Sequence, residues 1–320
     1  MKILPAGLAT FHAVAHAKSI RKASIKLGVE PSSVSRQIAI LERQMGTKLL
    51  ERTSTGVLLT HAGALLDEYA KGVLLDFESL RADLDDQRGS RRRLIRLATV
   101  ESIVSGGPLL AVGRFREKFD GVTFKVSVMP ASAVIDSVVQ GECDIGLAFC
   151  AQPHPEVLTM ATVAEPIVLA VPADHEWASA QSVHISDLLR HPLALPDLSF
   201  GVRGLFERAC NEANVTINPV LVSNDFEALR EFVLCGSGLA VLPVRAIARD
   251  RASERLVPVP ISVKALRDTT VDVIVSKRRL PRIVRLFAQE LSATVAKLAG
   301  SWSDAPHGLR QRLPLQRTAS

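Results

Sequence analysis

Residues 18–60 read KSIRKASIKLGVEPSSVSRQIAILERQMGTKLLERTSTGVLLT, and this stretch decides the fold of the amino-terminal end. Ser19 is suited to cap a short helix, and Gly28 is suited to end that helix in a left-handed conformation. Pro31 fits the first turn of a second helix. The apolar face of this second helix is predicted to consist of Val34, Ile38 and Leu41. Two short helices joined by a glycine turn predict a helix-turn-helix.

The other side of the second helix carries polar side chains that can reach base edges and phosphates when a helix lies in the major groove of DNA. They are Ser32, Ser33, Ser35, Arg36 and Gln37. For each serine, a capping or solvent-exposed role is an equal alternative. For Arg36 and Gln37 we favour DNA contact, because long polar side chains opposite an apolar stripe need a partner.

Positive charge is concentrated in the same stretch. Eight basic residues lie between Lys18 and Arg52 against three acidic ones, whereas the net charge of the whole chain is +6. A local positive field attracts a polyanion such as DNA through the release of counterions. A solvated basic surface would carry the same charge, so the charge supports DNA binding only together with the helix pattern.

A long helix is predicted to follow. Residues 53–59 suit a short hairpin wing around Gly56, and Thr60 can cap a helix from His61 to about Gln87. Its apolar residues recur at spacings of three and four, as in a coiled-coil seam. They are Leu66, Tyr69, Val73, Phe77, Leu80 and Leu84. This seam predicts a second copy of the chain as its partner, and docking on the same chain is the alternative.

From residue 94 onward, strand-like and helical stretches alternate. Strands are predicted at 94–100, 122–129, 144–149, 166–171, 220–222, 239–242 and 269–275. Helices are predicted at 109–119, 133–139, 204–214, 226–234 and 282–297. This alternation favours an α/β fold with open, largely parallel sheets and helices on both faces.

The chain resembles the LysR-type transcriptional regulators from about Leu8 to Leu298. The residues that carry the resemblance are Ser19, Ala23, Leu27-Gly28-Val29, Ser32, Val34-Ser35-Arg36-Gln37-Ile38, Leu41-Glu42, Gly46, Leu49, Glu51-Arg52, Leu59-Thr60 and Ala62-Gly63. Glu30 departs from the pattern, since the family commonly has Ser or Thr there as a helix cap. The resemblance adds Arg52 and Thr53, near the wing, to the expected DNA contacts.

The resemblance also implies a domain organisation. A winged helix-turn-helix is expected in residues 1–60, a linker and dimerisation helix in 61–90, and a flexible tail in 301–320. Between them, 91–300 would form a two-lobed effector domain like that of periplasmic binding proteins. Lobe 1 is expected at about 91–162 and 268–300, and lobe 2 at about 163–267.

The implied function is a sequence-specific DNA-binding regulator that responds to a small-molecule effector. It would bind double-stranded DNA, act as a homodimer or as a homotetramer built from dimers, and catalyse no reaction. The alternative is a ligand-binding or enzymatic α/β protein that does not bind DNA and whose N-terminal helices serve for protein contacts. A binding titration with promoter DNA and nonspecific competitor would distinguish the two.

The effector is expected at the carboxyl ends of the strands, between the lobes. The candidate residues are Thr99, Ser102, Ser132, Phe149, Phe200, Arg203 and Asn224. The hydroxyl groups suit an oxyanion, and Arg203 can pair with such an anion. Alternatively, Arg203 forms an internal ion pair with Glu101 or Asp197, and Phe149 belongs to the core. A small organic acid or an aromatic compound is the expected effector.

Other sites are disfavoured by the sequence. His12 and His16 have the spacing of two metal ligands on one helix face, but no third ligand accompanies them nearby. The four cysteines, Cys143, Cys150, Cys210 and Cys235, form no CxxC pair, so we expect reduced thiols, with a redox pair as the alternative. No cofactor is expected. No long apolar run follows Lys2 and no run of ~20 apolar residues is present, so we expect no signal peptide and a cytoplasmic location without membrane contact.

Overall fold

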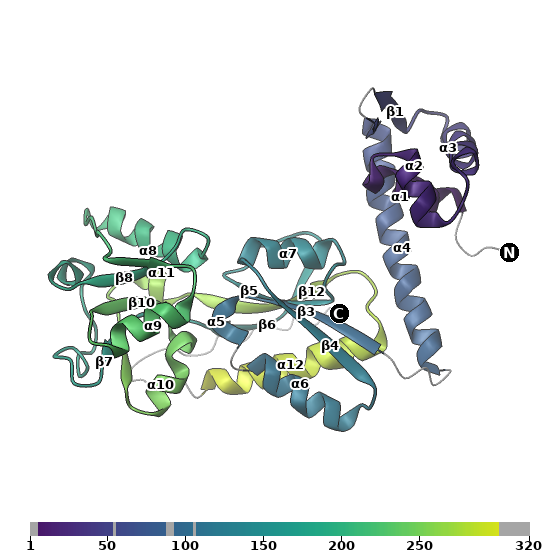
Figure 1. Cartoon of the computed structure of the whole chain (residues 1–320). Coiled ribbons are helices and arrows are strands. Elements are labelled where there is room, and N and C mark those ends of the chain that lie inside the picture. Colours follow the sequence, from purple (N-terminus) through teal and green to yellow (C-terminus); the bar gives the residue numbers. More distant parts are fainter. Residues whose placement is uncertain (1–5, 54–55, 88–92, 105–106, 301–320) are drawn as a thin grey trace, which may run out of the picture. The chain divides into compact units, whose positions relative to one another are not determined.

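The computed structural model describes residues 6–53, 56–87, 93–104 and 107–300, which belong to two compact units (Figure 1). The first unit comprises Met1–Gly89 with Arg278–Pro281, and the second comprises the rest of the chain. Among the described residues, no helix combines the length and the apolar character that crossing a membrane requires.

The first unit begins with three helices: α1 (Ala6–Ala17), α2 (Ile20–Leu27) and α3 (Pro31–Met45). The predicted caps of α2 are confirmed, because the Ser19 side chain accepts a hydrogen bond from the backbone N–H of Lys22 and Gly28 has a φ of 64°. Glu30 makes no side-chain cap to α3. The apolar face predicted for α3 is buried in a core with Phe11, Val14 and Ala23.

A hairpin of β1 (Leu50–Thr53) and β2 (Gly56–Leu59) follows α3. It is tied to α3 by the buried carboxylate of Glu42, which accepts hydrogen bonds from the backbone N–H groups of Leu49 and Leu50 at 3.0 and 3.3 Å. Lys48 pairs with the same carboxylate at 2.7 Å. Burial opposes ionisation, but these donors outweigh it and lower the pKa of Glu42. An ionised Glu42 therefore holds the hairpin against the end of α3.

The long helix α4 (His61–Gln87) begins where the hairpin ends. The Thr60 hydroxyl accepts a hydrogen bond from the Gly63 N–H at 2.9 Å, which confirms the predicted cap. In the single chain, Tyr69 and Leu84 of the predicted seam are 65% and 47% exposed, and their neighbour Leu65 is 59% exposed. The other seam residues are half-buried. The helix thus presents unpaired apolar side chains.

The second unit contains two five-stranded sheets, and we call each sheet with its helices a lobe. Lobe 1 has the strand order β4-β3-β5-β12-β6. Its strands are β3 (Arg93–Thr99), β4 (Val122–Val128), β5 (Ile145–Phe149), β6 (Val157–Ala164) and β12 (Thr270–Ser276). Its helices are α5 (Glu101–Val104), α6 (Gly107–Lys118), α7 (Ala131–Val139) and α12 (Arg282–Gly300). Helix α7 covers one face of the sheet, and α6 and α12 pack together on the other (Figure 1).

Lobe 2 has the strand order β11-β7-β10-β8-β9. Its strands are β7 (Ile167–Pro172), β8 (Leu193–Pro196), β9 (Leu221–Ser223), β10 (Leu239–Pro243) and β11 (Leu256–Pro260). Its α-helices are α8 (Gly201–Glu212), α9 (Phe226–Leu234), α10 (Ala248–Ala252) and α11 (Lys264–Arg267). Two 3-10 helices complete it, η1 (Ile185–Arg190) and η2 (Val244–Ile247).

The sheets are mixed rather than largely parallel as predicted. In lobe 1, β3 runs parallel to β4 and β5, but β12 is antiparallel to both of its neighbours. In lobe 2, β8 is parallel to β9 and β10, but β7 is antiparallel to β10 and β11. Each antiparallel pair includes at least one of the strands by which the chain enters or leaves lobe 2, which are β6, β7, β11 and β12.

The chain crosses between the lobes twice, and the two crossings are bonded to each other. The backbone N–H of Glu165 donates to the carbonyl of Thr269 at 2.8 Å, and the Thr269 hydroxyl donates to the carbonyl of Glu165 at 2.6 Å. The Glu165 carboxylate is fully buried and pairs with Arg245 of η2 at 2.5 Å. Burial raises the pKa of Glu165 to about 7, although the guanidinium acts in the opposite direction.

Candidate functional site

Helix α3 carries the five residues predicted to read DNA. Ser32 and Arg36 are exposed, whereas Ser33, Ser35 and Gln37 are half-buried. Their placement follows from the burial of the opposite, apolar face of the helix. The structure therefore leaves one long cationic side chain, that of Arg36, exposed on the predicted reading face.

Gln37 is less available than the sequence suggested. Its side-chain carbonyl oxygen accepts a hydrogen bond from the hydroxyl of Thr10 on α1 at 2.5 Å. One acceptor position of the amide oxygen is thus used to join α3 to α1, whereas the NH₂ group takes no part in this contact. The contact lies between residues 27 positions apart, which is why the helix pattern alone did not reveal it.

The wing has a structural requirement that the sequence analysis missed. Gly56 has a φ of 143°, and a Cβ atom added there would lie 2.5 Å from the carbonyl oxygen of Lys18. The same carbonyl accepts the N–H of Val57 at 3.0 Å. Thr53 is exposed, and its hydroxyl donates to the carbonyl of Gly56 at 3.2 Å. The side chain of Arg52 lies outside the described residues.

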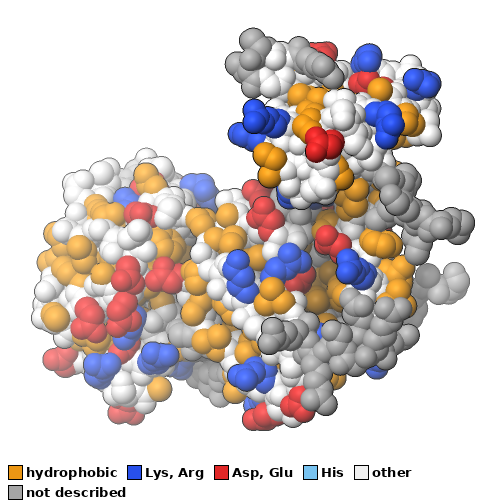
Figure 2. All heavy atoms as spheres, turned by 45° about the vertical axis from the view of Figure 1, so that its right-hand side comes forward, with side chains coloured by type: hydrophobic (Ala, Val, Ile, Leu, Met, Phe, Trp, Pro, Cys, Tyr) orange, Lys and Arg blue, Asp and Glu red, His pale blue; other side chains and the backbone are white. Residues whose placement is uncertain are grey.

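Most of the basic residues predicted to create the positive field are exposed. They are Lys18, Arg21, Lys22, Lys26, Arg36, Arg43 and Lys48. Figure 2 shows Lys and Arg side chains on the visible face of the first unit, at the upper right. Because Lys48 is neutralised by Glu42, the remaining cations provide the field that a phosphate backbone would meet.

In lobe 1, the effector candidates lie at the carboxyl ends of the strands but differ in accessibility. Thr99 ends β3, is fully buried, and donates its hydroxyl to the carbonyl of Val100 at 3.1 Å. Ser102 on α5 is also buried. Ser132, in the first turn of α7, is exposed. Of the three hydroxyl groups, only that of Ser132 is open to solvent in this arrangement.

In lobe 2, Arg203 is not the free cation that the anion-binding interpretation required. Its Nε atom pairs with Glu207 at 2.8 Å, and its terminal nitrogen donates to the carbonyl of Pro196 at 2.9 Å. An internal ion pair is therefore correct, but neither Glu101 nor Asp197 is its partner. Asp197 instead accepts a hydrogen bond from the N–H of Ser199 at 2.8 Å. The i,i+4 spacing of Arg203 and Glu207 on α8 was the missed signal.

Aromatic side chains and one carboxylate meet where the lobes face each other. A Cβ atom added at Gly201, the first residue of α8, would lie 3.3 Å from the Phe149 ring. Phe149 is buried, as expected for a core residue. The rings of Phe200 and Phe226 lie 4.6 Å apart. The Glu101 carboxylate of lobe 1 accepts a hydrogen bond from the N–H of Phe226 at 3.1 Å.

Glu101 was considered in the sequence only as a partner for Arg203, yet it makes a direct hydrogen bond between the lobes. Burial and the nearby carboxylate of Asp225 raise its pKa, while the N–H of Phe226 lowers it. Asn224, next to Asp225, is exposed. The start of α9 is therefore hydrogen-bonded to α5 of lobe 1, and η2 of lobe 2 also packs against α5.

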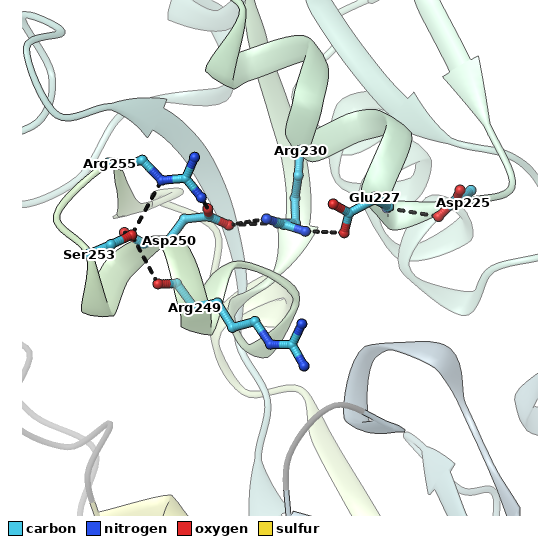
Figure 3. A network of polar contacts seen from close by, with 7 residues as sticks. All are labelled: Asp225, Glu227, Arg230, Arg249, Asp250, Ser253 and Arg255. Carbon is cyan, nitrogen blue, oxygen red and sulfur yellow. Dashed lines mark hydrogen bonds and ion pairs between the residues drawn. The ribbon is translucent and has the colours of Figure 1, made fainter.

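An ionic cluster holds α9 in place (Figure 3). Asp225 caps the helix by accepting the N–H of Glu227 at 2.8 Å. Further along the helix, Arg230 contacts both Glu227 and Asp250. Asp250 on α10 is fully buried, and Arg255 pairs with its second oxygen at 2.6 Å. A buried carboxylate between two guanidinium groups fixes α9, and with it the surface facing lobe 1.

The thiols are free and, for the most part, poorly ionised. Cys143 and Cys210 are buried, Cys150 is half-buried and Cys235 is exposed. Burial raises the pKa of Cys143 and Cys150, and it raises the pKa of Cys210 to about 11. Because the thiolate is the reactive form, these three cysteines lack the environment of a reactive thiol.

Comparison with known proteins identifies both halves of the chain. Residues 6–64 match the bacterial regulatory helix-turn-helix protein, lysR family, and residues 88–296 match the LysR substrate binding domain. The regulator BbuR of Bordetella bronchiseptica is 26% identical over 299 residues, covering 92% of this chain and 91% of BbuR. The hydrogen peroxide-inducible genes activator of Pectobacterium carotovorum is 26% identical over 251 residues, covering 78% and 82%.

The fold is also shared with solved structures. A full-length OxyR variant from Pseudomonas aeruginosa has a TM-score of 0.64 at 20% identity, covering 91% of this chain and 95% of that one. HinK from the same organism has a TM-score of 0.54 at 22% identity, covering 92% and 99%. The two family matches span the helix-turn-helix and most of both lobes, and the protein belongs to the LysR family of transcriptional regulators.

Proposed function

We propose that α3 is the helix through which this DNA-binding transcriptional regulator reads its operator. The observation that carries the proposal is the asymmetry of α3, which buries Val34, Ile38 and Leu41 and leaves Arg36 exposed among surrounding cations. An exposed guanidinium can form two hydrogen bonds with the major-groove edge of guanine. The proposed contact set is Ser32, Ser33, Ser35, Arg36 and the NH₂ group of Gln37, with Arg52 and Thr53 approaching the backbone.

We also propose the division of labour along the chain. Residues 1–60 bind DNA, 61–90 pair with a second copy through the exposed apolar side chains of α4, and 91–300 sense the effector. LysR-type regulators bind DNA and small effectors as oligomers and are not enzymes, so the alternative of a protein that does not bind DNA is not favoured. A cytoplasmic location follows from this proposal, because the operator lies on the chromosome.

The effector is proposed to bind between the lobes, near Thr99, Ser102, Ser132, Phe149, Phe200 and Asn224. Since Arg203 is already paired, an acidic effector would depend on backbone N–H groups instead. The first turns of α7 and α8 suit this role, because neither helix is capped by a side chain. Ligand binding would then favour one spacing of the lobes and shift the population of arrangements.

The relative from Pectobacterium carotovorum is named for induction of genes by hydrogen peroxide. A response of that kind through a thiol requires an accessible thiolate. Burial raises the pKa of Cys143, Cys150 and Cys210 in this chain. We therefore favour a reversibly bound small molecule over oxidation of these three thiols.

The proposal for α3 is tested by replacing Arg36 with Ala and titrating the DNA upstream of the protein's own gene. Loss of a bidentate base contact costs about 1–3 kcal/mol, or roughly five- to 150-fold in affinity. The titration includes nonspecific competitor DNA and is repeated at a second salt concentration. Arg285→Ala, which removes an exposed cation from α12, serves as the charge-matched control. Operator affinity that is the same in both variants would refute the assignment.

A further inference from the structure

Three potential metal ligands come together on the first unit, where α1 packs against α4. His12 and His16 lie one turn apart on α1, and Asp67 lies on α4. Nδ1 of His12 is 2.8 Å from Oδ1 of Asp67. The two imidazole rings are 4.5 Å apart, and one ligand atom from each residue lies within 4.8 Å of the others.

The third ligand was hidden from the sequence analysis because it is 55 residues from His12. The two histidines alone gave only the spacing of a ligand pair. Packing of α1 against α4 supplies the carboxylate that this pair lacked. Two imidazoles and one carboxylate form a set of three protein ligands that is common for zinc with an open fourth position.

The ligand types determine which ions fit. Calcium and magnesium prefer sites built from oxygen atoms, so two imidazole nitrogens disfavour both. Imidazole suits zinc, copper, nickel and iron. We propose that His12, His16 and Asp67 bind a divalent transition-metal ion of the Zn²⁺ class, with water in the remaining position.

A bound metal ion would require the three ligand atoms, now within 4.8 Å of one another, to move closer together. With bonds of about 2.0–2.1 Å and tetrahedral angles, neighbouring ligand atoms lie about 3.3 Å apart. The His12–Asp67 distance of 2.8 Å is that of a hydrogen bond, and a metal ion would take the place of its proton. A neutral His12 then carries its one N–H on Nε2, whereas an imidazolium releases one proton to solvent. The imidazole of His16 has to move closer to His12 and Asp67. Because His16 is exposed, its side chain can rotate toward them. The bound ion would link α1 of the helix-turn-helix to the linker helix α4.

A hydrogen bond between His12 and Asp67 could also stabilise α1 and α4 without any metal. Asp67→Asn separates the two roles, because the amide oxygen still accepts the hydrogen bond but is a poor ligand. If Asp67 is a metal ligand, Asp67→Asn should melt at the same temperature as the wild type in the absence of metal. Zn²⁺ should then raise the melting temperature of the wild type but not that of the variant. If Zn²⁺ raises the melting temperature of Asp67→Asn as much as that of the wild type, the proposal is overturned.

Direct binding is measured with the full-length chain, purified without a histidine tag and titrated with Zn²⁺ by calorimetry. His16→Ala removes an exposed ligand and is expected to weaken binding at this site by more than about tenfold. His61→Ala, which removes another exposed histidine of the same unit, is the matched control and should bind as the wild type does. Histidines of the second unit are present in every variant, so the difference reports the cluster alone. Failure of the wild type to bind Zn²⁺, or unchanged binding by His16→Ala, would refute the site.

Discussion

The buried carboxylate of Glu165 should make the stability of the second unit depend on pH. The side chain is fully buried at the first crossing between the lobes and pairs with Arg245. Burial raises its pKa from 4.5 to about 7 in the folded protein. Between these two values the folded state holds a proton that the unfolded state has released, so the contribution of Glu165 to stability is fully present below pH 4.5 and is lost as the pH rises through 7.

The size of the effect follows from the two pKa values. Each unit between them corresponds to about 1.4 kcal/mol, which gives a contribution of about 3 kcal/mol. Most of it should be lost between about pH 5 and about pH 8. In Glu165→Gln the side chain no longer titrates, so this part of the pH dependence disappears. Overall stability should also fall, because Arg245 loses its buried counterion.

The assay is urea unfolding across this pH range, followed by tryptophan fluorescence, to which Trp177 of lobe 2 contributes. All other titratable groups are the same in both proteins, so the difference between the wild type and Glu165→Gln isolates the carboxylate. Glu231→Gln, an exposed position on α9, is the control and should keep the pH dependence of the wild type. If Glu165→Gln retains that dependence as well, the carboxylate is ionised throughout and the reasoning is wrong.

Three further substitutions test the packing described above. Gly63→Ala places a Cβ atom 2.0 Å from the carbonyl oxygen of Leu49, so the free energy of unfolding should fall by about 1–3 kcal/mol or more. Thermal unfolding measures this change, and an unchanged melting temperature would contradict the contact. Asp250→Ala leaves the buried guanidinium of Arg230 with only the exposed Glu227, so the free energy of unfolding in urea should fall by about 3 kcal/mol. A decrease below about 1 kcal/mol would show that the ionic cluster does not stabilise α9. Tyr69→Glu puts a charge on the exposed apolar surface of α4, so the molar mass measured by light scattering should fall toward that of a monomer. An unchanged molar mass would place the interface elsewhere.

Local signals predicted the helix-turn-helix well, because its elements are specified by neighbouring residues. Ser19 and Gly28 act on the helix beside them. Three strands of the second unit were missed for physical reasons. β6 lies at a sheet edge, and only one of its eight residues is buried, so it lacks a buried apolar run. β11 contains Pro258 and Pro260, which an edge strand tolerates but which argue against a strand in the sequence. β8 has only four residues and is bounded by Pro192 and Pro196, which argue against a strand in the sequence.

The sites were predicted less completely, because their chemistry depends on partners far away in the chain. The sequence placed Gln37 on the polar face of its helix but could not show that Thr10 occupies its carbonyl oxygen. Asp67 gave no sign that it lies beside His12. Arg203 differs, since Glu207 follows it at helical spacing and the pair was recognisable. Helix periodicity predicts which face a residue occupies, but it does not predict what that face meets.

The two bonded crossings at Glu165 and Thr269 have a consequence for the architecture of the protein. All of lobe 2 is an uninterrupted insertion into lobe 1, and its two ends are adjacent in space. Such an insertion can be excised or exchanged with little disturbance to its host, because a short loop can rejoin the cut ends. Grafting a foreign lobe between these two positions would thus offer a route to chimeric sensors that keep the original DNA-binding segment.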